Sequence, residues 1–165
     1  MAQVKTDAEI EKISKACLLA ADILAELKGH VKVGITTLEL EEIADRLFRK
    51  KGAIPAFKGY RGYRFATCLS INEEVVHGLP GKRTLKDGDI IGVDVGAIVD
   101  GYYGDNAETF PVGKISAEAK RLISATRNAL NKAMAEARDG NHLGDVSFAV
   151  ESEAKKQGFS VVKDL

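Results

Sequence analysis

One carboxylate inside an apolar strand constrains this chain more than any other feature. Asp94 interrupts the run from Ile90 to Val99, which is otherwise apolar apart from glycine. An ionised carboxylate that is buried without a partner either costs several kcal/mol or takes up a proton. The run therefore predicts one of two things: a strand whose Asp94 side chain faces solvent, or a strand whose Asp94 side chain has a functional partner.

The dipeptide Asp100-Gly101 predicts where the next strand lies. It is typical of a two-residue hairpin turn, in which both central positions need a positive φ. In that register Gly96 faces Asp105 and Asp94 faces Ala107, so the two carboxylates share one face as diagonal neighbours about 7 Å apart. Two like charges at that distance repel unless a cation lies between them. The pattern favours a metal site, unless a bulge after the turn moves Asp105 to the other face.

Size and composition indicate one ordinary domain over residues 1–165, large enough to bury roughly 70% of its unfolded surface. The 24 basic residues balance the 24 acidic ones, so no net charge favours a specific nucleic-acid partner. The first residues have no apolar signal core, and no segment approaches the ~20 apolar residues of a membrane helix. Two cysteines are too few for a disulfide framework. We therefore expect a cytoplasmic protein without a membrane partner.

Apolar periodicity and capping residues predict an α+β fold. Four helices are expected, over residues 7–28, 36–51, 116–139 and 143–157. Strands are expected at 65–71, in a hairpin at 89–113 and from Phe159 to Val162, with a short strand or bend at 74–77. Residues 53–64, which are rich in glycine and aromatic residues, indicate a structured loop suited to a pocket wall. In the helix after Ser116, the residues expected to point inward are Leu122, Ile123, Thr126, Leu130 and Ala133.

Two further side chains admit more than one interpretation from chemistry alone. His77, between valine and glycine, suits a packed histidine as well as a catalytic one. Cys68 is most simply a small buried apolar side chain. Paired cysteines with zinc spacing and a phosphate-binding glycine loop are both absent from the sequence.

Three runs in this order closely resemble the bacterial type I methionine aminopeptidases. They are INEEVVHGLP at 71–80, DGDIIGVDVG at 87–96 and DGYYGD at 100–105, and the likeness is collinear from about residue 7 onward. The resemblance implies half of a pita-bread (creatinase/aminopeptidase-like) fold, with a curved antiparallel sheet covered by helices on one face. It also implies an exopeptidase that removes the N-terminal methionine from nascent polypeptides.

The same resemblance implies roles for individual residues. Asp94 would chelate one of two metal ions, and Asp105 would bridge both. His77 would hydrogen-bond the substrate and stabilise the transition state. Four residues would line the pocket for the methionine side chain: Phe57, Tyr60, Tyr63 and Cys68.

The chain departs from this family in its ligand set. The family site uses two aspartates, one histidine and two glutamates, and the ligand histidine lies in a Gly-His-Gly segment after the strand that begins here at Phe159. Only Asp94 and Asp105 are present, and none of the three histidines has that context. We expect an N-terminal portion that holds its divalent metals (Mn, Fe, Co or Zn) weakly and is inactive alone.

The resemblance also suggests partners. They are peptide N-termini beginning with methionine, and either a second copy of the chain or a complementing C-terminal half. Two alternatives to an enzyme fragment are a non-catalytic pita-bread-like binding module and a self-associating polypeptide made for the study of folding.

Overall fold

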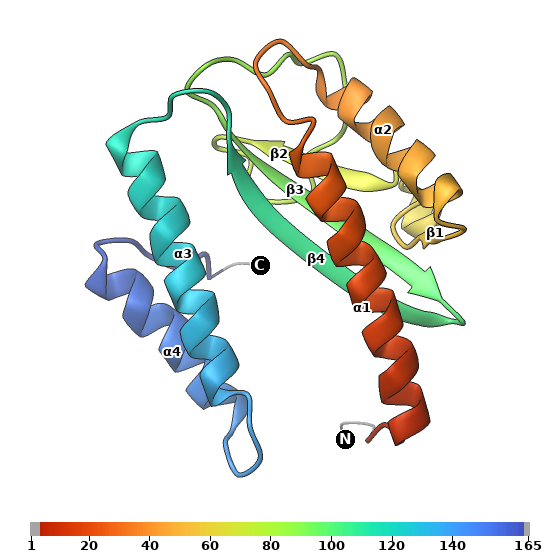
Figure 1. Cartoon of the computed structure of the whole chain (residues 1–165). Coiled ribbons are helices and arrows are strands. Elements are labelled where there is room, and N and C mark those ends of the chain that lie inside the picture. Colours follow the sequence, from red (N-terminus) through yellow and green to blue (C-terminus); the bar gives the residue numbers. More distant parts are fainter. Residues whose placement is uncertain (1–3, 164–165) are drawn as a thin grey trace. The chain divides into compact units, whose positions relative to one another are not determined.

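The computed structural model describes residues 4–163, which fall into two compact units divided after Ile115. The first unit contains two helices, α1 (Asp7–Lys28) and α2 (Thr37–Lys50), and a four-stranded antiparallel sheet (Figure 1). The strands are β1 (Ile54–Pro55), β2 (Thr67–Ile71), β3 (Ile90–Val99) and β4 (Tyr102–Pro111). Strand β3 is central, because β1, β2 and β4 all pair with it. The expected α+β class is confirmed.

Both helices of this unit begin at a capping box. The Thr36 hydroxyl accepts from the Glu39 N–H at 3.2 Å, and the Glu39 carboxylate accepts from the Thr36 N–H at 2.8 Å. Thr6 and Glu9 make the same reciprocal pair at the start of α1. These bonds satisfy backbone donors that a helix leaves unpaired at its first turn, so the local sequence is sufficient to define both helix starts.

Helix α1 covers one face of the hairpin formed by β3 and β4 (Figure 1). Its backbone lies so close to Gly104 that a Cβ there would be 2.2 Å from the Ala16 carbonyl carbon and the Cys17 nitrogen. Only glycine permits this approach. The buried stripe of α1 runs from Ala16 to Leu27, whereas Ile10, which periodicity places on that stripe, is 53% exposed.

The two faces of the sheet differ in chemistry because side chains alternate along each strand. The helix-covered face is apolar and joins α1 and α2 in one core, to which the sheet contributes Leu69, Ile71, Ile91, Val93, Val95, Ala97 and Phe110. The opposite face carries small and polar residues, which are Cys68, Ser70, Gly92, Asp94, Gly96, Asp105, Ala107 and Thr109. The polar face is therefore the place to look for chemistry.

The second unit is a pair of helices, α3 (Ala117–Glu136) and α4 (Leu143–Lys156). The buried stripe of α3 is made by Ala125, Ala129 and Ala133. Leu122 and Leu130 were expected to point inward, but they are 38% and 56% exposed; Thr126 is exposed as well. The correction has a physical reason: alanines four residues apart let two helices approach closely, so the small residues take the contact and the larger ones lie beside it.

One expected strand is absent from the described residues, because residues 159–162 are irregular. Residues 74–77, expected to form a short strand or a bend, contain a bend. A strand needs a hydrogen-bonded neighbour, which apolar residue types alone do not supply. The loop at 53–64 is largely as expected, although it includes β1 and a single 3₁₀ turn, Tyr60–Gly62. Within residues 4–163, no helix combines the length and apolarity needed to cross a lipid bilayer.

Replacement of Gly104 by alanine tests the contact between α1 and the hairpin. Because the atoms in the way are backbone atoms of a helix, we expect Gly104→Ala to lower the free energy of unfolding by about 3 kcal/mol or more. The measurement is urea unfolding followed by circular dichroism. The matched control is Gly144→Ala in α4, where an added Cβ meets nothing within 4 Å. Equal stability of the two variants would contradict this packing.

Candidate metal and substrate site

The hairpin has the register predicted from its turn. Asp100 and Gly101 have φ values of 50° and 81°, as the two-residue turn requires. Gly96 pairs with Asp105, and Asp94 pairs with Ala107, with no bulge between the turn and these positions. Asp94 and Asp105 therefore lie diagonally on the same face, and that face is the one opposite α1.

The environment of Asp94 is unfavourable for a charged side chain. Its Oδ1 atom is buried and has no hydrogen-bond partner. Burial raises the pKa of Asp94 to about 7, and the negative charge of Asp105 acts in the same direction. A buried carboxylate oxygen without a donor is rare in folded proteins. The missing partner is the feature that a bound cation would explain.

Carboxylate oxygens suit divalent cations, so Asp94 and Asp105 fit part of a metal site. They do not complete one. Among residues 4–163, no group of three or more histidine, cysteine, aspartate or glutamate side chains is placed to hold a metal ion. Any further ligands would have to come from outside the described residues.

Two of the predicted pocket residues lie directly beside Asp94. Cys68 faces Asp94 across the β2–β3 pair and is 5% exposed, and burial raises the pKa of its thiol. The Tyr63 hydroxyl donates to the Thr67 carbonyl at 2.8 Å, and burial is the main cause that raises the pKa of Tyr63. Both groups are therefore neutral at physiological pH and form an uncharged wall beside the carboxylates.

The other two pocket residues differ in their placement. Phe57 packs on Gly96, where an added Cβ would lie 2.7 Å from the ring, so the ring covers the polar face at the residue that pairs with Asp105. Tyr60 is 64% exposed on the 3₁₀ turn, with the Arg61 guanidinium 5.4 Å from its ring centre. The structure thus brings Phe57, Tyr63 and Cys68 to the carboxylates, whereas Tyr60 lies at the exposed end of the loop.

His77 is exposed and has a left-handed backbone with a φ of 59°. Its neighbour Gly78 is tied to β2, because its N–H donates to the Ser70 hydroxyl at 3.0 Å and its carbonyl accepts from the Leu69 N–H at 2.9 Å. A Cβ at Gly78 would lie 2.3 Å from the Leu69 carbonyl oxygen, so only glycine fits. These bonds hold the backbone of His77 beside β2, two residues along the strand from Cys68.

One buried carboxylate escapes sequence reasoning. Glu41 on α2 is 6% exposed and accepts hydrogen bonds from the Ala66 and Thr67 N–H groups and from the Thr67 hydroxyl. The available signal was its position between Leu40 and Ala44 on the buried stripe of α2. A glutamate within an apolar stripe predicts a buried acceptor, but the stripe does not reveal its donors.

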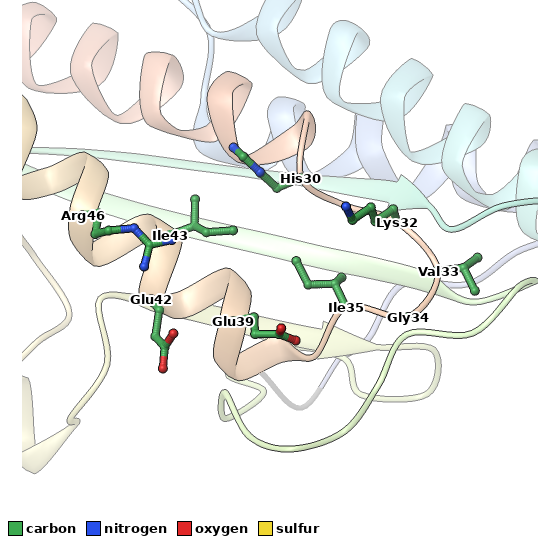
Figure 2. Close-up of a pocket in the computed structure, with 9 residues that line it drawn as sticks. All are labelled: His30, Lys32, Val33, Gly34, Ile35, Glu39, Glu42, Ile43 and Arg46. Atoms are coloured by element: carbon green, nitrogen blue, oxygen red, sulfur yellow. The ribbon is translucent and has the colours of Figure 1, made fainter.

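A separate hollow lies between the α1–α2 connection and α2. Figure 2 shows its lining side chains, none of which is a predicted site residue: His30, Lys32, Val33, Gly34, Ile35, Glu39, Glu42, Ile43 and Arg46. Both basic and acidic groups line it, so it has no single charge preference. Neither Asp94 nor Asp105 lines it.

Comparison with known sequences settles the family. A profile of metallopeptidase family M24 matches residues 11–165. The chain belongs to metallopeptidase family M24. Among curated M24 relatives, methionine aminopeptidase 1 of Bacillus subtilis (strain 168) is 48% identical over 160 residues, which is 97% of this chain and 64% of the relative. The chain therefore spans slightly less than two thirds of that relative.

Solved structures agree with the family assignment. The methionine aminopeptidase of Thermotoga maritima has a TM-score of 0.96 and 44% identity, and the match covers 99% of this chain and 66% of that one. The prolidase of Pyrococcus furiosus has a TM-score of 0.83 at 23% identity, covering 94% of this chain and 44% of that one, and so shows the fold alone. The M24 chain thus has part of the pita-bread fold, as the resemblance implied.

The half-buried Asp94, whose pKa is raised, predicts an unusual dependence of stability on pH. An ordinary aspartate titrates near pH 4, so between about pH 4 and 7 the folded metal-free chain binds more protons than the unfolded chain. Its free energy of unfolding should fall as pH rises through this range. We expect the wild type to lose about 1–3 kcal/mol more than Asp94→Asn between pH 5 and pH 8, measured by urea unfolding with a chelator present.

Asp100→Asn is the matched control for this measurement. It removes a carboxylate from the same hairpin, and asparagine before glycine is a preferred residue in this type of turn. The control should keep the pH dependence of the wild type. Parallel pH profiles for the wild type and Asp94→Asn would contradict the assigned environment of Asp94.

Proposed function

We propose that this chain carries the N-terminal part of the active site of a metal-dependent aminopeptidase that removes methionine from the N-termini of new polypeptides in the cytoplasm. One observation carries the proposal: Asp94 and Asp105 share the polar face of the sheet, and a buried oxygen of Asp94 lacks a partner. The relatives named methionine aminopeptidase support the same function.

In this proposal Asp94 and Asp105 contribute to a site for two divalent ions, whether Mn, Fe, Co or Zn. Such ions, when bound, supply a hydroxide at neutral pH and polarise a carbonyl group. Two carboxylates alone hold divalent ions weakly, because affinity follows ligand number and type. Tight binding and hydrolysis therefore require the further ligands that the rest of an M24 enzyme contributes.

The residues around the carboxylates suit the side chain of methionine. Phe57, Tyr63 and Cys68 present an aromatic and thiol surface of uncharged groups. An unbranched, polarizable thioether packs well on such a surface. With the side chain held there, the free amino group of the substrate would lie near Asp94 and Asp105, which accounts for exopeptidase action. Tyr60 would contact the substrate from the rim of the pocket.

His77 is proposed to act on the reacting carbonyl group. Its position next to the anchored Gly78 fixes its main chain beside β2, and its exposed ring is free to reach a substrate on the polar face. A hydrogen bond donated to an oxygen that gains negative charge stabilises the transition state more than the bound substrate. His77 would thus affect the rate more than substrate binding.

A fusion tests this proposal. The chain would be continued by the C-terminal third of the Bacillus subtilis relative, and methionine release from a Met-Ala-Ser peptide would be measured with Mn²⁺. We expect release by the fusion and none by the chain alone. Asp94→Asn and Asp105→Asn should each lower kcat/KM of the fusion by about 10³-fold or more, and His77→Ala should lower kcat by about 10²-fold.

Asp100→Asn again supplies the control, because it removes a hairpin carboxylate at the exposed turn. It should leave kcat/KM of the fusion unchanged. An active fusion that tolerates Asp94→Asn would refute the proposed metal role. Chelator-sensitive turnover by the unfused chain would refute the need for further ligands, and a soluble fusion that binds the peptide without hydrolysis would favour a binding module.

We also propose that the chain alone self-associates, as a two-fold dimer that covers surface otherwise covered by the rest of the enzyme. Large apolar side chains are exposed on the helical unit, among them Leu130 (56%), Met134 (58%) and Phe148 (71%). Exposed apolar groups that gather in this way mark association surfaces. Because a two-fold interface uses the same patch on both copies, one substitution alters it twice.

Sedimentation velocity at micromolar concentrations tests this association. We expect a concentration-dependent dimer in the wild type and a shift toward monomer in Leu130→Lys. Leu18→Lys is the control, since Leu18 is 67% exposed on α1, outside the helical unit. A compact monomer at every concentration would rule out the dimer.

A further inference from the structure

Glu41 is a buried carboxylate to which the proposed mechanism gives no part. It lies on α2 and is 6% exposed. Its Oε1 accepts from the Ala66 N–H at 2.6 Å, and its Oε2 accepts from the Thr67 N–H at 3.0 Å and from the Thr67 hydroxyl at 2.6 Å. All three donors are neutral. A charged acceptor that collects three donors in the interior costs desolvation, so its presence needs a reason.

The three donors sit where β2 begins. Ala66 and Thr67 are both fully buried and immediately precede Cys68 in the chain. Because side chains alternate along a strand, Thr67 turns toward the helices and Glu41 while Cys68 turns toward Asp94. Glu41 therefore holds the strand from the side opposite the carboxylate pair.

A second bond extends the same anchor to the pocket loop. The Thr67 carbonyl accepts from the Tyr63 hydroxyl at 2.8 Å. The backbone of Thr67 thus donates its N–H to Glu41 and accepts at its carbonyl from Tyr63. Hydrogen bonds therefore link Glu41 through Thr67 to Tyr63, and Cys68 is the next residue in the chain.

We propose that Glu41 is a positioning residue, whose carboxylate holds the beginning of β2 so that Tyr63 and Cys68 stand against Asp94. The assignment of Tyr63 and Cys68 to a substrate pocket rests on the proposed function, but the coupling itself does not. Glutamine in place of Glu41 presents one acceptor and one donor group to three donors. At least one buried N–H or O–H then loses its partner, and the beginning of β2 loosens.

The test uses the whole chain without metal, so that it is independent of turnover. In a Cys17→Ala background, Cys68 is the only thiol, and its alkylation rate reports how often β2 opens. We expect Glu41→Gln to raise that rate about tenfold, corresponding to the loss of one buried hydrogen bond. The matched control is Glu42→Gln, the same change at the exposed neighbouring residue, which should leave the rate unchanged.

The second readout is the ring resonance of Tyr63 at neutral pH, followed by NMR of ¹³C-labelled tyrosine rings and assigned with Tyr63→Phe. The Tyr63 hydroxyl donates to the Thr67 carbonyl at 2.8 Å, so the ring reports the position of that carbonyl. Glu41→Gln should shift the ring resonance of Tyr63, whereas Glu42→Gln should not. A general loss of stability would not shift the folded-state resonance of one tyrosine selectively.

The outcomes are decisive in either direction. Faster alkylation of Cys68 together with a shifted ring resonance of Tyr63 supports the proposal. Reduced stability with both local readouts unchanged overturns it. If Glu41→Gln does not fold, Thr67→Val decides, because it removes only the hydroxyl donor and keeps the strand-forming shape; faster alkylation than in Glu42→Gln supports the proposal, and an unchanged rate overturns it.

Discussion

The pairing register of β3 and β4 is the constraint on which the rest of this structure depends. A two-residue turn at Asp100 and Gly101 sets that register, and side-chain alternation then assigns every residue of both strands to a face. A slip of one residue would turn Asp94 into the core and Val95 toward solvent. The energetic cost of such a slip is large, because the backbone of α1 packs against Gly104 and leaves no room for a side chain there. The register therefore determines both which residues of the hairpin enter the core and that Asp94 and Asp105 share the opposite face.

Glycine at two positions lets other groups approach this sheet from opposite sides. Gly104 admits the backbone of α1 on the apolar face, and Gly96 admits the ring of Phe57 on the polar face. The polar face also collects unfavourable features, which are the unpartnered oxygen of Asp94 and the left-handed backbone of His77 nearby. Strain and unsatisfied groups of this kind persist where function maintains them. Arg61, Asn72 and Asp100 also have a positive φ, so the unpartnered oxygen of Asp94 is the feature that distinguishes the polar face.

The comparisons distinguish a shared fold from a closer family likeness. The prolidase of Pyrococcus furiosus shares the fold at 23% identity, so the arrangement of helices and sheet tolerates wide changes in sequence. The methionine aminopeptidases share much more, at 48% identity in Bacillus subtilis and 44% in Thermotoga maritima. The chain spans 64% of the Bacillus relative. Within residues 4–163, Asp94 and Asp105 have no third candidate ligand beside them, and large apolar side chains are exposed on α3 and α4.

Local signals in the sequence determined much of the first unit. The capping box of α2, the hairpin turn and the shared face of Asp94 and Asp105 all follow from neighbouring residues, because helix starts and two-residue turns are short-range structures. Tertiary structure decided the rest. Three features depend on elements distant in the chain. They are the choice of Ala129 over Leu130 for the buried face of α3, the absence of a strand neighbour for residues 159–162, and the donors that surround Glu41. Periodicity reports that a residue is suited to burial, whereas only packing determines what it is buried against.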